Sequence, residues 1–86
     1  MKQLEITFMG RGEVKNFSFT QIEQSEKAYL YEVVCNESKT THYEVFKRKE
    51  NTYYNCISYP TSKAFGLWAW TFRNYSEAHN KFISII

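Results

Sequence analysis

Apolar and polar residues alternate along most of this chain with a period of two, which is typical of β-strands that have two unlike faces. Glycine, asparagine, polar tetrapeptides and the single proline interrupt the alternation at points where turns are expected. The pattern predicts six strands, at residues 3–9, 14–22, 28–36, 41–48, 53–59 and 67–72. In the third of these strands both faces carry some apolar side chains.

The period changes after the sixth strand. Asn74 stands three residues before Glu77, a variant of the capping box that begins helices. Apolar residues then follow at helical spacing, at Tyr75, Ala78, Phe82 and Ile85 or Ile86. The sequence therefore predicts one α+β domain over residues 1–86, a curved and mainly antiparallel sheet of about six strands in meander order, with one C-terminal helix packed on one face.

The sixth strand carries the largest side chains. Trp68, Trp70 and Phe72 alternate with smaller residues, and Phe65 lies just before them. Three rings on one side of a strand predict a core or an interface, because so much apolar surface is seldom left in water. We favour burial of these rings under the helix. The alternative places the small side chains of Ala69 and Thr71 against the helix.

The predicted helix is too narrow for the predicted sheet. Six strands spaced by about 4.8 Å make a sheet roughly 25 Å wide, whereas a helix is about 10 to 12 Å across. The remaining aromatic surface must be covered by a curled sheet, a second subunit or a bound molecule. We therefore expect a non-enzymatic interaction module that uses an aromatic sheet face, either as a homodimer or with a protein partner.

The charge of the chain favours no polyanion strongly, because 11 basic and 9 acidic residues leave a net charge of +2. Lys47, Arg48 and Lys49 form the single basic run, and Tyr53 and Tyr54 follow across a predicted turn. Lysine and arginine neutralise phosphates while tyrosine rings stack on bases. Single-stranded nucleic-acid binding through these five residues is therefore the alternative function that the sequence suggests.

Residues 63–70 resemble in part the signature of the RNA-recognition family, in which aromatic rings stack on bases. The residues that match in type are Lys63, Phe65, Gly66 and Trp70. Leu67 replaces a stacking ring, and no helix is predicted between the first two strands, where that family has one. We therefore interpret Gly66 as a loop glycine that precedes a core strand.

No catalytic constellation is visible in the sequence. Cys35 and His42 are the residues from which a nucleophilic thiol site could be built, but cysteines in strands are more often small buried apolar residues. The spacing of Cys35 and Cys56 matches no metal motif, and no helix follows Gly10 and Gly12 to bind a phosphate. We predict no catalytic residues, no metal and no cofactor.

Three features bear on the compartment. The N-terminal residues lack the apolar stretch of a secretion signal, and no apolar run approaches the ~18 residues that span a bilayer. The two cysteines fit a reducing environment. The sequence thus predicts a cytoplasmic protein with no membrane partner.

Overall fold

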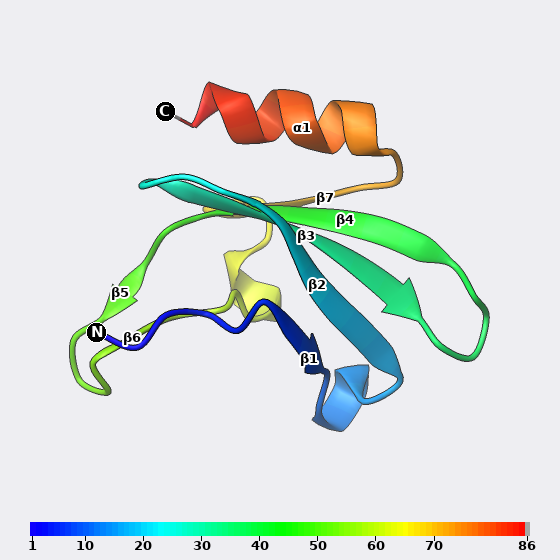
Figure 1. Ribbon diagram of the computed structural model, residues 1–86, viewed down its shortest axis with the longest axis horizontal. Helices are drawn as coiled ribbons and strands as arrows, with labels where there is room; N and C mark the ends of the chain where they lie inside the picture. The colour runs from blue at the N-terminus through cyan, green and yellow to red at the C-terminus, as the bar shows by residue number, and fades with distance from the viewer. Residues whose placement is uncertain (86) are drawn as a thin grey trace.

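The computed structural model describes residues 1–85 (Figure 1). Its elements are β1 (Thr7–Met9), the 3₁₀ turn η1 (Gly12–Val14), β2 (Phe17–Gln24), β3 (Ala28–Cys35), β4 (Thr41–Lys47), β5 (Glu50–Asn51), β6 (Cys56–Ile57), the 3₁₀ turn η2 (Ser62–Ala64), β7 (Ala69–Phe72) and α1 (Tyr75–Ser84). Ile86, the last position proposed for the helix, lies outside the described residues.

Five of the strands form one antiparallel sheet in the order β1-β2-β3-β4-β7, and β5 and β6 form a separate hairpin. Helix α1 packs on β3, β4 and β7 (Figure 1). The α+β class, the antiparallel meander and the single terminal helix are therefore confirmed. The sheet keeps meander order because the β5–β6 hairpin is an insertion between β4 and β7.

The predicted fifth strand at 53–59 is wrong. Within it only β6 is extended, and it pairs with β5 outside the main sheet. The residues before it form a turn in which the backbone N–H of Tyr54 donates to Oδ1 of Asn51 over 3.1 Å, and Asn55 has a φ of +52°. Asparagine supports both features, since its side chain caps turns and tolerates the left-handed region. The main sheet consequently has five strands, one fewer than expected.

Burial on β3 follows the predicted alternation and explains the two-layered core. Its even-numbered Leu30 joins the helix-side cluster, whose buried members are Ala28, Leu30, Val45, Ala78 and Phe82. Its odd-numbered Tyr31 joins the larger cluster on the other face, whose buried members are Phe19, Tyr29, Tyr31, Val33, Phe46, Ile57, Ala64 and Ala69. A central strand buried on both sides is thus apolar at consecutive positions.

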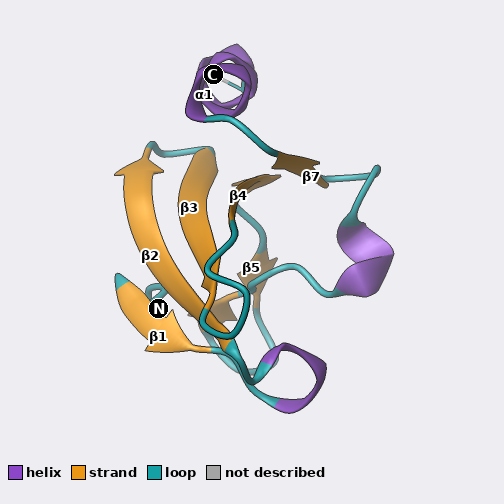
Figure 2. Cartoon of the chain, turned by 90° about the vertical axis from the view of Figure 1, so that its right-hand side faces the viewer, coloured by secondary structure: helices purple, strands orange, loops and turns teal. Residues whose placement is uncertain are grey.

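The face away from α1 is covered by the chain itself. Figure 2 shows the curved sheet with β5 and η2 on the side away from the helix. The chain returns across this face over residues 56–68, which we call the returning segment. Its Tyr59 ring enters the larger cluster, where the ring centroid lies 4.9 Å from that of Phe46 and 5.3 Å from that of Tyr31. Of the three covers expected for the aromatic surface, a curled sheet, a second subunit or a bound molecule, the structure shows the first, because the curled sheet and the returning segment pack over the larger cluster.

The three rings of the last strand do not share one face, which corrects a second expectation. β7 begins only at Ala69, and the backbone of Gly66, with φ of +90°, turns the preceding residues. Trp68 therefore lies on the larger cluster, 6.4 Å from Phe46, whereas Phe72 packs with the helix-side cluster. A turn changes which face a side chain reaches, and the alternation of residue types does not reveal where that turn ends.

The helix begins at the predicted cap. The Oδ1 atom of Asn74 accepts a hydrogen bond from the backbone N–H of Glu77 over 2.8 Å, and Ala78 and Phe82 are buried against the sheet. This cap satisfies one of the N–H groups that a helix terminus leaves without an intrahelical partner. The helix that packs on β3, β4 and β7 thus has a side-chain cap at its first turn.

We expect Asn74→Ala to lower the free energy of unfolding by about 1 kcal/mol, because alanine cannot accept that hydrogen bond. Urea denaturation followed by tryptophan fluorescence measures the loss. Asn80→Ala is the matched control, since Asn80 is an exposed residue of the same helix and alanine favours helix there. Equal loss in both variants would contradict a capping role for Asn74.

Candidate binding cleft on the aromatic face

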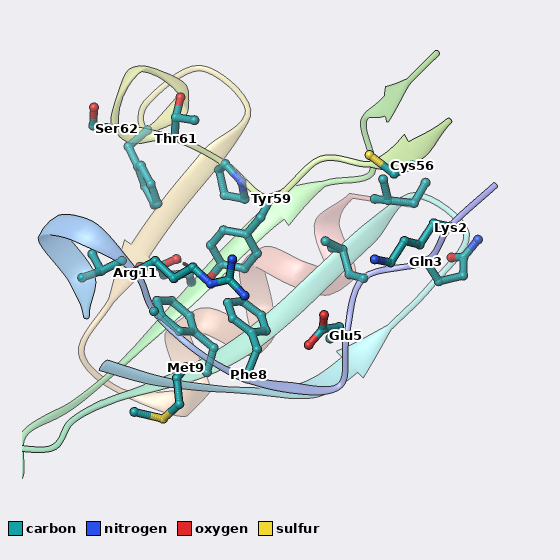
Figure 3. A pocket seen from close by; sticks show the side chains of 18 of the residues that line it. Lys2, Gln3, Glu5, Phe8, Met9, Arg11, Cys56, Tyr59, Thr61 and Ser62 are labelled. Carbon is teal, nitrogen blue, oxygen red and sulfur yellow. Dashed lines mark hydrogen bonds between the residues drawn. The ribbon is translucent and has the colours of Figure 1, made fainter. Parts of the chain in front are cut away.

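The chain does not close completely over the larger cluster, and a cleft of about 1000 Å³ remains beside β1 (Figure 3). We call it the aromatic cleft. Its lining includes Phe8 and Phe19 from the sheet, Tyr59 from the returning segment, and Leu4, Ile57 and Phe65. Its volume is at the upper end of the range found for ligand pockets, about 300 to 1000 Å³.

Rings that contact one another form the floor of the cleft. Phe8 and Phe19, which are direct cross-strand partners, stack with centroids 4.7 Å apart and an interplanar angle of 3°. Tyr59 meets the edge or face of each ring at 5.4 Å. Such contacts restrict every ring to one orientation, so the floor is a preformed surface.

Residues 2–5 form one wall of the cleft. Hydrogen bonds attach this N-terminal wall to the rest of the molecule. The N–H of Lys2 donates to the carbonyl of Asn55, and the N–H of Ile57 donates to the carbonyl of Lys2, both over 2.9 Å. The hydroxyl of Tyr31 donates to the carbonyl of Glu5 over 2.5 Å. The wall is therefore part of the fold, and the cleft does not depend on a free terminal strand.

One end of the cleft is polar. The hydroxyl of Tyr59 donates to Oε1 of Glu44 over 2.6 Å, and Nε2 of His42 lies 3.1 Å from Oε2 of the same carboxylate. The Glu44 side chain is 13% exposed. Burial, followed by the nearby charge and hydrogen bond of Glu44, raises the pKa of Tyr59 well above its ordinary value. Both oxygens of Glu44 thus have partners, and the Tyr59 phenol stays protonated at neutral pH.

The rim of the cleft carries apolar side chains, two basic side chains and the carboxylate of Glu5. Met9 and Val14 line it with exposed fractions of 55% and 42%. Lys2 and Arg11 also line it, and Figure 3 shows Arg11 reaching toward Tyr59 and Phe8. No ion pair of Arg11 occurs among the side chains that the structure describes. The rim can therefore offer cations to a ligand whose apolar part lies on the rings.

The five residues proposed for nucleic-acid binding do not form one surface around a cavity. Lys47 and Arg48 line a second cavity near the end of α1. Lys49 points elsewhere, with its Nζ atom 5.0 Å from the centre of the Trp68 ring. Tyr53 and Tyr54 are highly exposed at the tip of the β5–β6 hairpin. β4 ends at Lys47, so the residues that follow leave the strand, and the two tyrosines lie beyond β5.

The four aromatic residues proposed for a core or interface have different surroundings. Phe65 packs on the larger cluster and lines the aromatic cleft, and Trp68 packs on the same cluster under Lys49. Trp70 lines the second cavity, and Phe72 packs under the helix. The sequence reasoning missed Phe8, Phe19 and Tyr59 as a shared floor, although the alternation along the first two strands was a signal for the two phenylalanines.

The thiol-nucleophile hypothesis gains no contact from the structure. His42 is paired with Glu44, and no hydrogen bond joins it to Cys35 among the residues described. Hydrogen bonds from the side chain and backbone of Ser38 lower the pKa of Cys35, which is a free thiol, as is Cys56. Among the side chains that the structure describes, no three His, Cys, Asp or Glu residues gather as a metal site.

The described part of the chain has no helix long and apolar enough to cross a membrane. Its one α-helix follows the last strand, unlike the RNA-recognition arrangement with a helix between the first two strands. Searches against models of known protein families, curated proteins and solved structures found no match to this chain.

Proposed function

We propose that this protein is a non-enzymatic interaction module that binds an apolar segment of a protein partner in the aromatic cleft. The observation that carries this proposal is the continuity of the ring floor with the exposed rim residues Met9 and Val14. A pocket for a small molecule encloses most of its ligand. An apolar area that continues onto the outer surface instead suits an occupant that extends beyond the cleft, as a protein segment does.

The lining suggests the chemistry of that segment. A bulky apolar or aromatic side chain would lie on Phe8, Phe19 and Tyr59, in the manner of the anchor residues that dominate interfaces. Lys2 and Arg11 on the rim would favour acidic residues beside the anchor, by charge complementarity. Met9 is suited to the rim because methionine side chains adapt their shape to different partners.

The polar end of the cleft supports a binding role over a catalytic one. Glu44 is the buried carboxylate of the cleft, and both of its oxygens have partners in Tyr59 and His42. A general base must expose its carboxylate to the substrate proton, whereas the Glu44 side chain is only 13% exposed. The interactions of Glu44 instead attach the returning segment to β4 and thereby keep the cleft open.

Selection from a random display library of short peptides tests the proposal. Peptides that bind the protein should carry an apolar anchor next to acidic residues. They should bind Met9→Asp at least about tenfold more weakly, because a carboxylate on the rim is unpaired and repels acidic residues. Ile83→Asp is the matched control, as Ile83 is a similarly exposed apolar residue on α1, outside the cleft.

Three results would overturn the proposal. One is that no peptide is enriched, and another is that enriched peptides bind Met9→Asp and Ile83→Asp with equal affinity. The third comes from analytical ultracentrifugation of the protein alone. A dimer that Met9→Asp dissociates would show that a second copy of the chain occupies the cleft in place of another protein.

A further inference from the structure

The second cavity has a volume of about 640 Å³. It lies between the end of α1, the β2–β3 turn and the end of β4. Figure 1 shows the C-terminal end of α1 above that turn. Four basic side chains line the cavity, namely Lys27, Lys47, Arg48 and Lys81, together with Trp70. We call this cavity the cationic groove.

The groove contains the whole excess positive charge of the protein. Its lining has four basic residues and the two acidic residues Glu26 and Glu50, a difference of +2. The full chain, with 11 basic and 9 acidic residues, has the same difference. Basic and acidic residues outside the groove are therefore equal in number. The net charge of +2 is concentrated in the groove, where it attracts anions.

The fold brings these cations together from three separate segments, the β2–β3 turn, the end of β4 and α1. A backbone hydrogen bond of 2.7 Å from the N–H of Arg48 to the carbonyl of Lys27 joins the β2–β3 turn to the end of β4. From α1, the Nζ atom of Lys81 lies 4.0 Å from the centre of the Trp70 ring. Among the described residues, the Arg48 guanidinium makes two long contacts, 3.6 Å to Glu50 and 3.5 Å to Tyr29, and so keeps donors for a ligand.

The β5–β6 hairpin begins beside the groove and carries two tyrosine rings that are exposed to solvent. Tyr53 is 86% exposed and Tyr54 is 73% exposed, and their centroids lie 4.8 Å apart. From Arg48 to Tyr53 the chain advances five residues, which reach at most about 17 Å. The hydrogen bond from Tyr54 to Asn51 holds the tip in shape. The cationic groove and the exposed rings of Tyr53 and Tyr54 therefore lie within reach of one short polymer.

We propose that the cationic groove binds the phosphates of a single-stranded nucleic acid whose neighbouring bases stack on Tyr53 and Tyr54. Phosphate contacts supply affinity without regard to sequence, and stacking on tyrosine selects unpaired bases, because a duplex keeps its bases stacked inside. This surface is separate from the aromatic cleft, so the inference does not depend on the proposed function.

Fluorescence anisotropy with a labelled oligothymidylate tests the inference at low salt. With up to four cations in contact with phosphates, the slope of log K against log salt should be about −2 to −3. Lys27→Glu/Lys47→Glu should weaken binding at least tenfold. Lys15→Glu/Lys63→Glu, which makes the same change of net charge at exposed lysines outside both cavities, should weaken it much less.

Removing the rings separates stacking from charge. Tyr53→Ala/Tyr54→Ala should weaken oligothymidylate binding about fivefold or more and leave the salt slope unchanged, since stacking carries no charge. Binding of a duplex of the same length should be weaker than that of the single strand and indifferent to this variant.

Four results would overturn the inference. They are no oligothymidylate binding at tens of micromolar protein, equal weakening by the two lysine double variants, duplex binding as tight as that of the single strand, and tyrosine variants that bind like the unmodified protein. Vesicles of phosphatidylserine with phosphatidylcholine provide the comparison with lipid. Binding to vesicles without binding to oligothymidylate would assign the groove to a membrane surface and contradict the nucleic-acid proposal.

Discussion

Phe46→Ala is expected to lower the free energy of unfolding by about 3 to 5 kcal/mol, the usual cost of removing a fully buried phenylalanine side chain. Phe46 has no exposed surface, and its ring contacts those of Tyr29, Tyr31 and Tyr59 at centroid distances of 5.5, 5.7 and 4.9 Å. Rings held on three sides cannot collapse into the space left behind, so the cavity persists.

A loss of this size is large for so small a protein. At about 0.05 to 0.15 kcal/mol per residue, 86 residues give a total stability of roughly 4 to 13 kcal/mol. Urea denaturation monitored by far-ultraviolet circular dichroism measures the change. Tyr54→Ala, which removes an exposed ring, serves as the control and should change stability by less than about 0.5 kcal/mol. A loss below about 1 kcal/mol for Phe46→Ala would show that the larger cluster is loosely packed.

The second large effect is expected in alkaline solution and arises from Tyr59. Burial and the neighbouring Glu44 raise the pKa of this phenol above 10.0, its ordinary value, so the folded protein retains a proton that the unfolded chain loses. Above about pH 10 the unfolded state binds fewer protons. The free energy of unfolding should therefore fall by about 1.4 kcal/mol per pH unit from this group, and be independent of its ionisation below pH 10.

Tyr59→Phe isolates this contribution. The variant should be less stable at neutral pH by about 1 to 3 kcal/mol, because Glu44 loses the donor of its 2.6 Å hydrogen bond. Its stability should also decline less steeply above pH 10, by about 1.4 kcal/mol per pH unit. Burial raises the pKa of Tyr31 as well, but that phenol is present in both proteins and cancels in the comparison. Equal slopes for the two proteins would mean that Tyr59 ionises without unfolding.

These two predictions connect stability with the proposed binding role. The Phe46 ring contacts the Tyr59 ring, and Tyr59 is part of the floor of the aromatic cleft. A floor held by ring contacts and by the Glu44 hydrogen bond is preorganised, which lowers the entropy that a ligand loses on binding. Variants that loosen this floor should therefore weaken peptide binding as well as stability.

Part of the candidate sites could be predicted from local residue types. Lys47 and Arg48 stand out as a basic run, and both line the cationic groove. Lys27 and Lys81 were missed because each is an isolated lysine in its own segment. They join the groove only because the β2–β3 turn and the end of α1 meet the end of β4 in space. Contacts between distant segments leave no mark on local periodicity.

The residue pattern by itself determined most of β2, β3 and β4, that β3 is apolar on both faces and that a capped helix follows the last strand, because these depend on neighbouring residues and their period. Tertiary structure alone decided that β5 and β6 leave the main sheet, that Trp68 and Phe72 lie on opposite faces, and that Tyr59 covers the sheet. Those outcomes depend on where turns end and on long-range packing, which residue pattern does not encode.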